Sequence, residues 1–262
     1  MDDTPLAADP QPGPGDDVFG EAMSLIGGAQ EAGIPVRLIG GLAVRYLTPD
    51  YPPRARDGQD LDLASVSAHR RKLSEFLVSK GYEGDRTFNA LYGHKQLYFA
   101  SPSGRTVDVL IDRIEMSHTL QFADRIARMP HTLDPCDLLL SKLQIFELNE
   151  KDAQDALYLT SAFEVRAGDE PGTIGLDRFC AVLADDWGWW RTVTMNLDKI
   201  RGLAQGDGTR LVPENRAFDP AEQLQRLRTE ADETPKSLKW RLRAKVGDRK
   251  RWYELPEETE HY

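Results

Sequence analysis

The spacing of apolar residues is mixed in the first half of the chain and helical in the second. Short apolar runs between turn residues predict strands over 36–39, 95–100 and 106–111, and a further strand that carries Asp60 and Asp62. Helical spacing predicts helices over 17–33, 42–47, 67–80, 134–148, 150–165, 175–185, 187–204 and 219–245, and from about residue 119 onward it is the only pattern. This order is typical of an α+β protein, with a mixed sheet and flanking helices followed by a helical C-terminal domain.

The two ends of the chain differ in composition from the rest. Residues 1–16 are rich in Pro, Gly and Asp and poor in large apolar groups, so we expect a disordered leader. We expect a mixed α/β domain over 17–130, a helical domain over 131–250 and an acidic tail over 251–262.

Composition points to a soluble protein. Hydrophobic residues make up 40% of the 262 residues and charged residues 29%. No apolar run approaches the roughly 20 residues that a membrane-spanning helix needs, and the N-terminus is acidic, unlike a signal peptide. Cys136 and Cys180 lie far apart in apolar surroundings, as reduced core thiols do. We therefore expect a cytoplasmic protein with no membrane partner.

Charge is unevenly distributed along the chain. Residues 236–251 carry a local excess of +7 within a net charge of −10, so the remainder carries −17. Cations interleaved with aromatic residues suit RNA, and the RNA-binding candidates are Lys239, Trp240, Arg241, Arg243 and Lys245. The alternative is a surface helix whose cations pair with the acidic body. Trp187, Trp189 and Trp190 are interpreted as core aromatics.

Three aspartates and two glycines suggest a site for metal and phosphate. Asp60 and Asp62 lie on one strand face, about 6–7 Å apart, and Asp108 interrupts an apolar strand in which an acidic side chain needs a partner. Carboxylates are the ligands that Mg²⁺ prefers. Gly40 and Gly41, at a turn that opens a helix, let backbone N–H groups approach a triphosphate. Taken singly, an Asp-x-Asp pair and a Gly-Gly turn are common in such a chain.

In this order the Gly-Gly turn, the Asp-h-Asp strand and the third strand carboxylate resemble the nucleotidyltransferase superfamily of DNA polymerase β type. Arg56, four residues before Asp60, looks like part of the R-x-T-x-D-h-D pattern of AbiEii-type nucleotidyltransferases. These are the toxin components of type IV toxin–antitoxin pairs and include the MenT toxins. In the second half, a Lys on one helix and a basic-Asp-x-x-Asp cluster opening the next are similar to that family's helix pair. Lys142 matches the first, and Lys151, Asp152 and Asp155 match the second.

The resemblance implies a nucleotidyltransferase domain over 17–130 that transfers nucleotides from an NTP to RNA, at a tRNA 3′ end, with a cognate antitoxin as partner. Two Mg²⁺ ions, or Mn²⁺, would serve as cofactors. The implied catalytic residues are Asp60, Asp62, Asp108, Lys142, Asp152 and Asp155, with Asp60, Asp62 and Asp108 holding the metal. The implied nucleotide-binding residues are Gly40, Gly41, Arg56 and Lys142.

Two other classes of function remain open. One is transfer to a small molecule, such as an aminoglycoside or lincosamide antibiotic, or to a protein side chain. The other is a degenerate, non-catalytic binding module, which the intact Asp60 and Asp62 pair disfavours. The basic segment favours RNA over a small cationic antibiotic, which would prefer an acidic cleft. The histidines show no spacing that suggests a zinc site.

Overall fold

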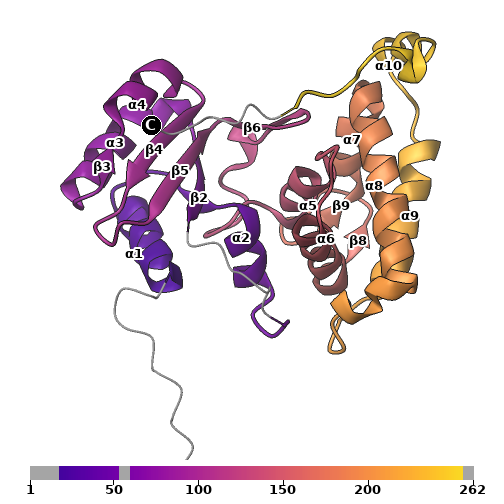
Figure 1. Cartoon of the computed structure of the whole chain (residues 1–262), viewed down its shortest axis with the longest axis horizontal. Helices are drawn as coiled ribbons and strands as arrows, with labels where there is room; N and C mark the ends of the chain where they lie inside the picture. Colours follow the sequence, from indigo (N-terminus) through magenta and orange to yellow (C-terminus); the bar gives the residue numbers. More distant parts are fainter. Residues whose placement is uncertain (1–17, 53–59, 256–262) are drawn as a thin grey trace, which may run out of the picture.

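The computed structural model of the chain describes residues 18–52 and 60–255, and divides them into a sheet-containing half and a helical half (Figure 1). The helices are α1 Val18–Glu31, α2 Gly40–Leu47, α3 Arg70–Ser79, α4 Arg86–Tyr92, α5 Pro135–Leu143, α6 Glu150–Ala162, α7 Leu176–Asp185, α8 Trp187–Gln205, α9 Pro220–Glu233 and α10 Leu238–Ala244. The strands are β1 Arg37–Leu38, β2 Leu61–Ser65, β3 Glu83–Gly84, β4 Gln96–Ala100, β5 Thr106–Ile111, β6 Arg113–Glu115, β7 Thr119–Gln121, β8 Val165–Arg166 and β9 Ile174–Gly175.

The main sheet has five strands in the order β1-β2-β5-β4-β3. β2 and β5 run parallel, and the other neighbours are antiparallel, so the sheet is mixed as expected. The predicted hairpin is present as β4 and β5. The parallel pairing of β2 with β5 places two strands that are distant in sequence side by side at the centre of the sheet.

The two faces of this sheet have different surroundings. Along β5 the residues alternate between buried and half-buried, with Val107 and Val109 on the buried face and Asp108 on the other. The buried face belongs to the core, together with residues of α1 and α3, and α1 approaches α3 closely where Gly28 leaves room for the Phe76 ring. The opposite face is left for polar side chains.

The helical half packs directly on the sheet-containing half. α2 contacts β2 on one side and α5 and α6 on the other, and it lies between the two halves in Figure 1. The backbone of Leu38 in β1 bonds to both His131 and Leu133, just ahead of α5. A single buried core cluster runs from Ala22 to Ala231. The elements of the two halves are therefore fixed relative to one another by backbone pairing and by shared core.

Several elements differ from the prediction. The first helix of the α5–α6 pair ends at Leu143 rather than 148, and residues 119–121 form a strand because they pair with β6. The helical run over 219–245 is two helices, since Pro235 has no backbone N–H to continue the helix. β2 begins at Leu61, so Asp60 lies just before it. α2 begins at Gly40, so both glycines belong to the helix.

Some predictions fall outside the described residues. The leader over 1–16, the loop that contains Arg56, and most of the acidic tail lie there. Within residues 18–52 and 60–255, none of the helices combines the length and the apolar character required to cross a bilayer.

Candidate active site

Asp62 and Asp108 lie side by side on the polar face of the sheet. They are paired positions on the parallel strands β2 and β5, and neighbouring strands are about 4.8 Å apart. Paired residues of adjacent strands point to the same face, so the two carboxyl groups share one surface. On the next strand, the amide Nε2 of Gln96 donates to Oδ1 of Asp108 at 2.7 Å. This bond fixes the orientation of the Asp108 carboxyl group.

The start of α2 lies against the carboxyl group of Asp62. Gly40 has φ of +65°, a conformation that L residues rarely adopt. A Cβ placed on Gly40 would lie only 2.5 Å from Oδ2 of Asp62. The glycine therefore gives Asp62 the space it occupies, and also brings the helix start within contact of the carboxylate. The N-cap residue is Ile39, whose apolar side chain forms no capping bond, and the N–H groups and the dipole of a helix start attract anions.

Across from the sheet, Lys142 of α5 is held between two carboxylates of α6. Its Nζ lies 2.8 Å from Oδ2 of Asp155 and 3.0 Å from Oδ1 of Asp152. All three residues are buried. Burial alone would lower the pKa of Lys142, but the charges of Asp155 and Asp152 outweigh it, and the pKa is raised. Lys142 is therefore a fixed cation in this site.

A cavity of about 330 Å³ joins these groups. Its polar walls come from both halves of the chain: Gly40, Asp62, Gln96, Asp108 and Glu115 from the first, and Ser141, Lys142 and Asp152 from the second. Its apolar walls are Ile39, Leu110, Ile114, Met116 and Ile145. A phosphate group could therefore lie between a carboxylate pair on one side and a lysine on the other.

The structure brings together most of the predicted site residues. Gly40, Asp62, Asp108, Lys142 and Asp152 line the cavity, and Asp155 adjoins it through Lys142. Asp60 does not line it and is exposed. Gly41 lies in the first turn of α2, and Arg56 lies outside the described residues.

The carboxylates of this cavity fit a divalent cation that is also bound by substrate phosphates. Among the residues that the structure describes, no three or more His, Cys, Asp or Glu side chains gather into a complete metal site. Mg²⁺, however, is commonly held by one or two carboxylates together with substrate phosphates. Asp62 and Asp108 supply such a pair, and Gly40 has no Cβ that would clash with the carboxyl group of Asp62. The third ligand predicted from sequence, Asp60, stays a prediction.

Sequence reasoning missed Gln96, which the structure places at the centre of the site. Gln96 and Tyr98 alternate with the buried Leu97 and Phe99 along β4. In the predicted hairpin that alternation puts Gln96 on the same face as Asp108, so the signal was present. Glu115 and Ser141 could not be found in this way, because their approach to the cavity depends on the packing of the two halves.

The proposed RNA-binding segment is only partly available to a ligand. Trp240 packs edge-on against Trp190 with ring centroids 5.3 Å apart, and the guanidinium of Arg243 lies 4.6 Å over the ring of Trp187. Nζ of Lys239 lies near Asp185, at 3.8 Å. Arg241 and Lys245 are exposed. Trp240 and Arg243 are thus half-buried against aromatic rings of α8, and RNA binding by this segment stays a prediction.

The aromatic residues after α10 also pack inward. Tyr253 stacks on Phe146 with a centroid separation of 3.6 Å, and Nε1 of Trp252 donates to Thr192. The core interpretation of the earlier tryptophans is confirmed for Trp187 and Trp189, which are buried. The aromatic residues that interrupt the basic segment therefore anchor it to the body.

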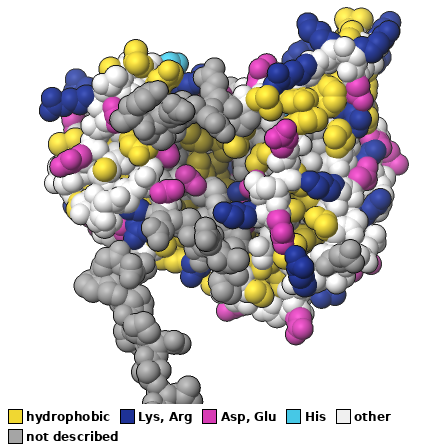
Figure 2. All heavy atoms as spheres, in the orientation of Figure 1, with side chains coloured by type: hydrophobic (Ala, Val, Ile, Leu, Met, Phe, Trp, Pro, Cys, Tyr) yellow, Lys and Arg dark blue, Asp and Glu magenta, His cyan; other side chains and the backbone are white. Residues whose placement is uncertain are grey.

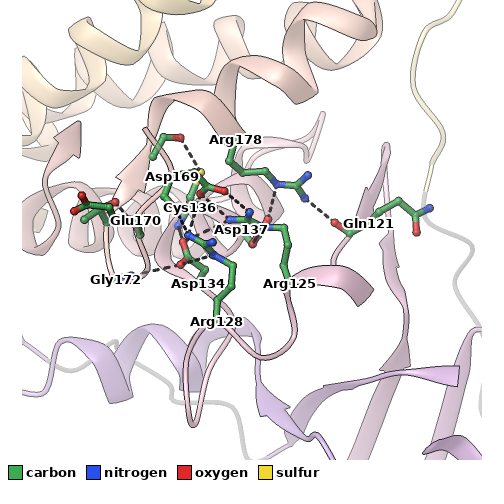
Figure 3. A network of polar contacts seen from close by, with 12 residues as sticks. Gln121, Arg125, Arg128, Asp134, Cys136, Asp137, Asp169, Glu170, Gly172 and Arg178 are labelled. Atoms are coloured by element: carbon green, nitrogen blue, oxygen red, sulfur yellow. Dashed lines mark hydrogen bonds and ion pairs between the residues drawn. The ribbon is translucent and has the colours of Figure 1, made fainter. Parts of the chain in front are cut away.

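A network of buried ion pairs fixes the start of α5, the helix that carries Lys142 (Figure 3). Asp137 accepts from Nε of Arg125 at 2.6 Å and from Nε of Arg178 at 2.9 Å. Asp134, the N-cap of α5, accepts from the backbone of Cys136, and its pKa is raised by burial. The network ties the segment before α5 to α7, so it positions the helix without touching the cavity.

Comparisons with known proteins include a likeness to a solved structure. No protein-family model and no curated protein matches the sequence. Among solved structures, the chain is similar to the antibiotic-resistance factor ANT(2'')-Ia, with 11% identity and a TM-score of 0.38, over 55% of this chain and 83% of that one. A likeness of this size establishes neither fold nor activity.

Proposed function

We propose that this protein is a metal-dependent nucleotidyltransferase that uses an NTP. The observation that carries the proposal is the in-register pair of Asp62 and Asp108, facing Lys142 across one cavity beside the start of α2. Carboxylates for a cation, a lysine for phosphate and a helix start for the triphosphate are the groups that phosphoryl chemistry needs.

The reaction in this site is a displacement at phosphorus. A hydroxyl of the acceptor gives its proton to a carboxylate of the site, for which Asp108 is the candidate. Its oxygen forms a bond to the α-phosphorus of the NTP, the bond from that phosphorus to the oxygen bridging to the β-phosphate breaks, and pyrophosphate leaves. Bound Mg²⁺ would neutralise charge on the attacking and leaving oxygens. Asp62 and Asp108 would hold the ion. As the sequence analysis predicts, we propose two ions, with Asp60 as a further ligand.

The remaining residues have positioning roles. Gln96 orients Asp108 through its amide. Lys142 faces the cavity as a cation and binds phosphate oxygens, while Asp152 and Asp155 keep it charged and in place. The first turn of α2, with Gly40 and Gly41, receives the triphosphate.

Transfer to RNA, at a tRNA 3′ end, is the first acceptor hypothesis. Its support is the resemblance of the Arg56, Asp60 and Asp62 motif to that of the AbiEii-type toxins, and the exposed cations Arg241 and Lys245 could contact phosphates without base stacking. In this hypothesis the protein is a toxin that a cognate antitoxin restrains.

Transfer to an amino-bearing small molecule is the second hypothesis, and one observation favours it. Glu115 and Asp152 line the cavity in addition to the carboxylate pair, so four carboxyl groups and one lysine face it. A metal ion offsets part of this charge, but an acidic cavity still favours a cationic acceptor over a phosphate backbone.

One assay tests both hypotheses. The full chain is incubated with each α-labelled NTP, Mg²⁺, and either total tRNA or a panel of aminoglycosides. We expect label on one acceptor class with the wild type and none with Asp62→Asn. Asp85→Asn serves as a control, since Asp85 caps α4 away from the cavity. Absence of labelled product from every NTP and acceptor would contradict the proposal.

A further inference from the structure

The basic segment, residues 236–251, carries an exposed apolar stripe along α10 that the proposed activity does not use. Leu238, Leu242 and Val246 are 65%, 54% and 38% exposed. They are spaced four residues apart along α10 and the turn that follows it, so they share one face. Exposed apolar residues that occur singly need no explanation, but three in a row mark an interaction surface.

Cations flank this stripe. Figure 2 shows dark blue and yellow side chains gathered over α10, at the edge of the molecule. The exposed cations of the segment are Lys239, Arg241, Lys245, Arg249, Lys250 and Arg251. The surface is therefore apolar along its centre and positive along its sides.

The body of the protein holds this surface in a fixed orientation. Trp240 and Arg243, on the opposite face of α10, pack against the aromatic rings of α8. The backbone N–H of Ser237 donates to the carbonyl of Ala184 at 2.9 Å, and its side chain caps α10. The stripe therefore points outward because the helix is anchored on its other side, and a partner would meet a preformed surface.

Three kinds of partner fit this surface poorly. Single-stranded RNA binds exposed aromatic rings, and here Trp240, Trp252 and Tyr253 are engaged with the body. An anionic membrane would attract the cations but repel the rest of the chain, which carries −17, and no exposed aromatic is present on the stripe to anchor it. A second copy of α10 would bring two positive segments together.

An acidic amphipathic helix complements both the apolar stripe and the positive charge beside it. Its apolar face would cover Leu238, Leu242 and Val246, as helices do when they bind in apolar grooves. Its Asp and Glu residues would pair with the flanking cations. We propose that α10 and the turn after it, residues 238–251, form a docking surface for an acidic amphipathic helical segment of a partner protein.

The size of the surface sets the expected strength. The stripe extends over about two helical turns, so the interface lies at the small end, where binding is weak and transient, with a Kd on the order of micromolar. Because charge pairing occurs at an exposed rim, affinity should fall as ionic strength rises.

A designed peptide tests this inference with the full-length protein. The probe is a labelled 15-residue helix with Leu at every third or fourth position and Glu on its other faces. The control peptide has the same composition with the leucines spread around the helix. We expect the probe to bind at micromolar concentration, at least about tenfold more tightly than the control peptide, and to weaken in high salt.

Matched substitutions locate the binding. Leu238→Asp and Leu242→Asp should each weaken the probe about tenfold or more. Leu91→Asp, at a residue of α4 that is 63% exposed, introduces the same charge elsewhere and should leave binding unchanged. Each variant is checked by circular dichroism, since an exposed substitution should leave the fold intact.

Several results would overturn the inference. Equal binding of the two peptides, or no binding, would do so, as would an affinity that Leu242→Asp leaves unchanged. Tighter binding to phosphatidylserine vesicles or to a single-stranded RNA oligonucleotide would assign the surface to another partner class. Self-association that Leu242→Asp abolishes would assign it to a second copy of the chain. None of these results depends on nucleotidyl transfer.

Discussion

The substitution Lys142→Met should destabilise the protein strongly, because it leaves two buried carboxylates without their cation. Lys142, Asp152 and Asp155 have side chains that are 11%, 12% and 1% exposed. Methionine keeps the volume of the side chain and removes only its charge. Removing one partner of a buried ion pair costs about 3–5 kcal/mol, and we expect a loss of that size in the free energy of unfolding at pH 7.

The pH dependence of this loss has a defined sign. Since the pKa of Lys142 is raised in the folded protein, its contribution is complete below the unfolded lysine pKa of about 10.4, and it is lost as the pH rises through the folded value. The difference between wild type and Lys142→Met should therefore stay constant from about pH 6 to 9.

Urea denaturation followed by tryptophan fluorescence measures the loss. Arg71→Met is the matched control, because Arg71 pairs with Glu75 in a salt bridge whose side chains are 92% and 65% exposed. It should change the free energy of unfolding by less than about 1 kcal/mol. A loss below about 1 kcal/mol for Lys142→Met would refute the reasoning, because it would mean that water reaches the cluster.

Two further predictions concern acid stability and the helix start. Burial lowers the pKa of His118 to about 4, with Asp186 opposing the shift, so stability should be lost as the pH falls from about 6.5 to 4, by up to about 3 kcal/mol. His118→Gln should remove that loss. Urea denaturation of both proteins at pH 6.5 and 4 measures it, and an equal loss in the variant would contradict the assignment to His118. Gly40→Ala should lower nucleotide transfer at least about tenfold by displacing Asp62. Gly104→Ala, also at positive φ but with no atom within 4 Å, should leave transfer unchanged, and equal effects of the two substitutions would count against the role of Gly40.

Local patterns in the sequence were enough to predict the hairpin and the helix pair. The apolar run over 106–111 predicted the strand, and the structure confirms it, with Asp108 on the half-buried face. The neighbouring position of Asp62 could not be predicted by the same means, because period 2 defines the face of a strand but not its partner. Pairing of β2 with β5 is a long-range contact. The need of Asp108 for a partner and the family resemblance suggested that these carboxylates meet, but neither defined the strand pairing.

The basic segment shows a second limit of local patterns. The sequence shows that cations and aromatic residues occur together here, but not which side chains face the body of the protein and which face outward. The aromatic rings of Trp240 and Trp252 turn inward because α8 offers apolar partners, while the aliphatic Leu238 and Leu242 stay outside. Which side chains of this segment face outward therefore depends on its tertiary contacts with α8, which composition does not define, and RNA binding by the segment stays a prediction.

Binding of Mn²⁺ measured by electron paramagnetic resonance, with and without a non-hydrolysable NTP analogue, tests the central claim most directly. We expect the wild type to bind Mn²⁺ more tightly when the analogue is present, because the phosphates complete the coordination by Asp62 and Asp108. The double variant Asp62→Asn/Asp108→Asn, shown to be folded by its thermal melting, should lose this binding. Unchanged Mn²⁺ affinity in the double variant would contradict the assignment of these carboxylates as the metal site.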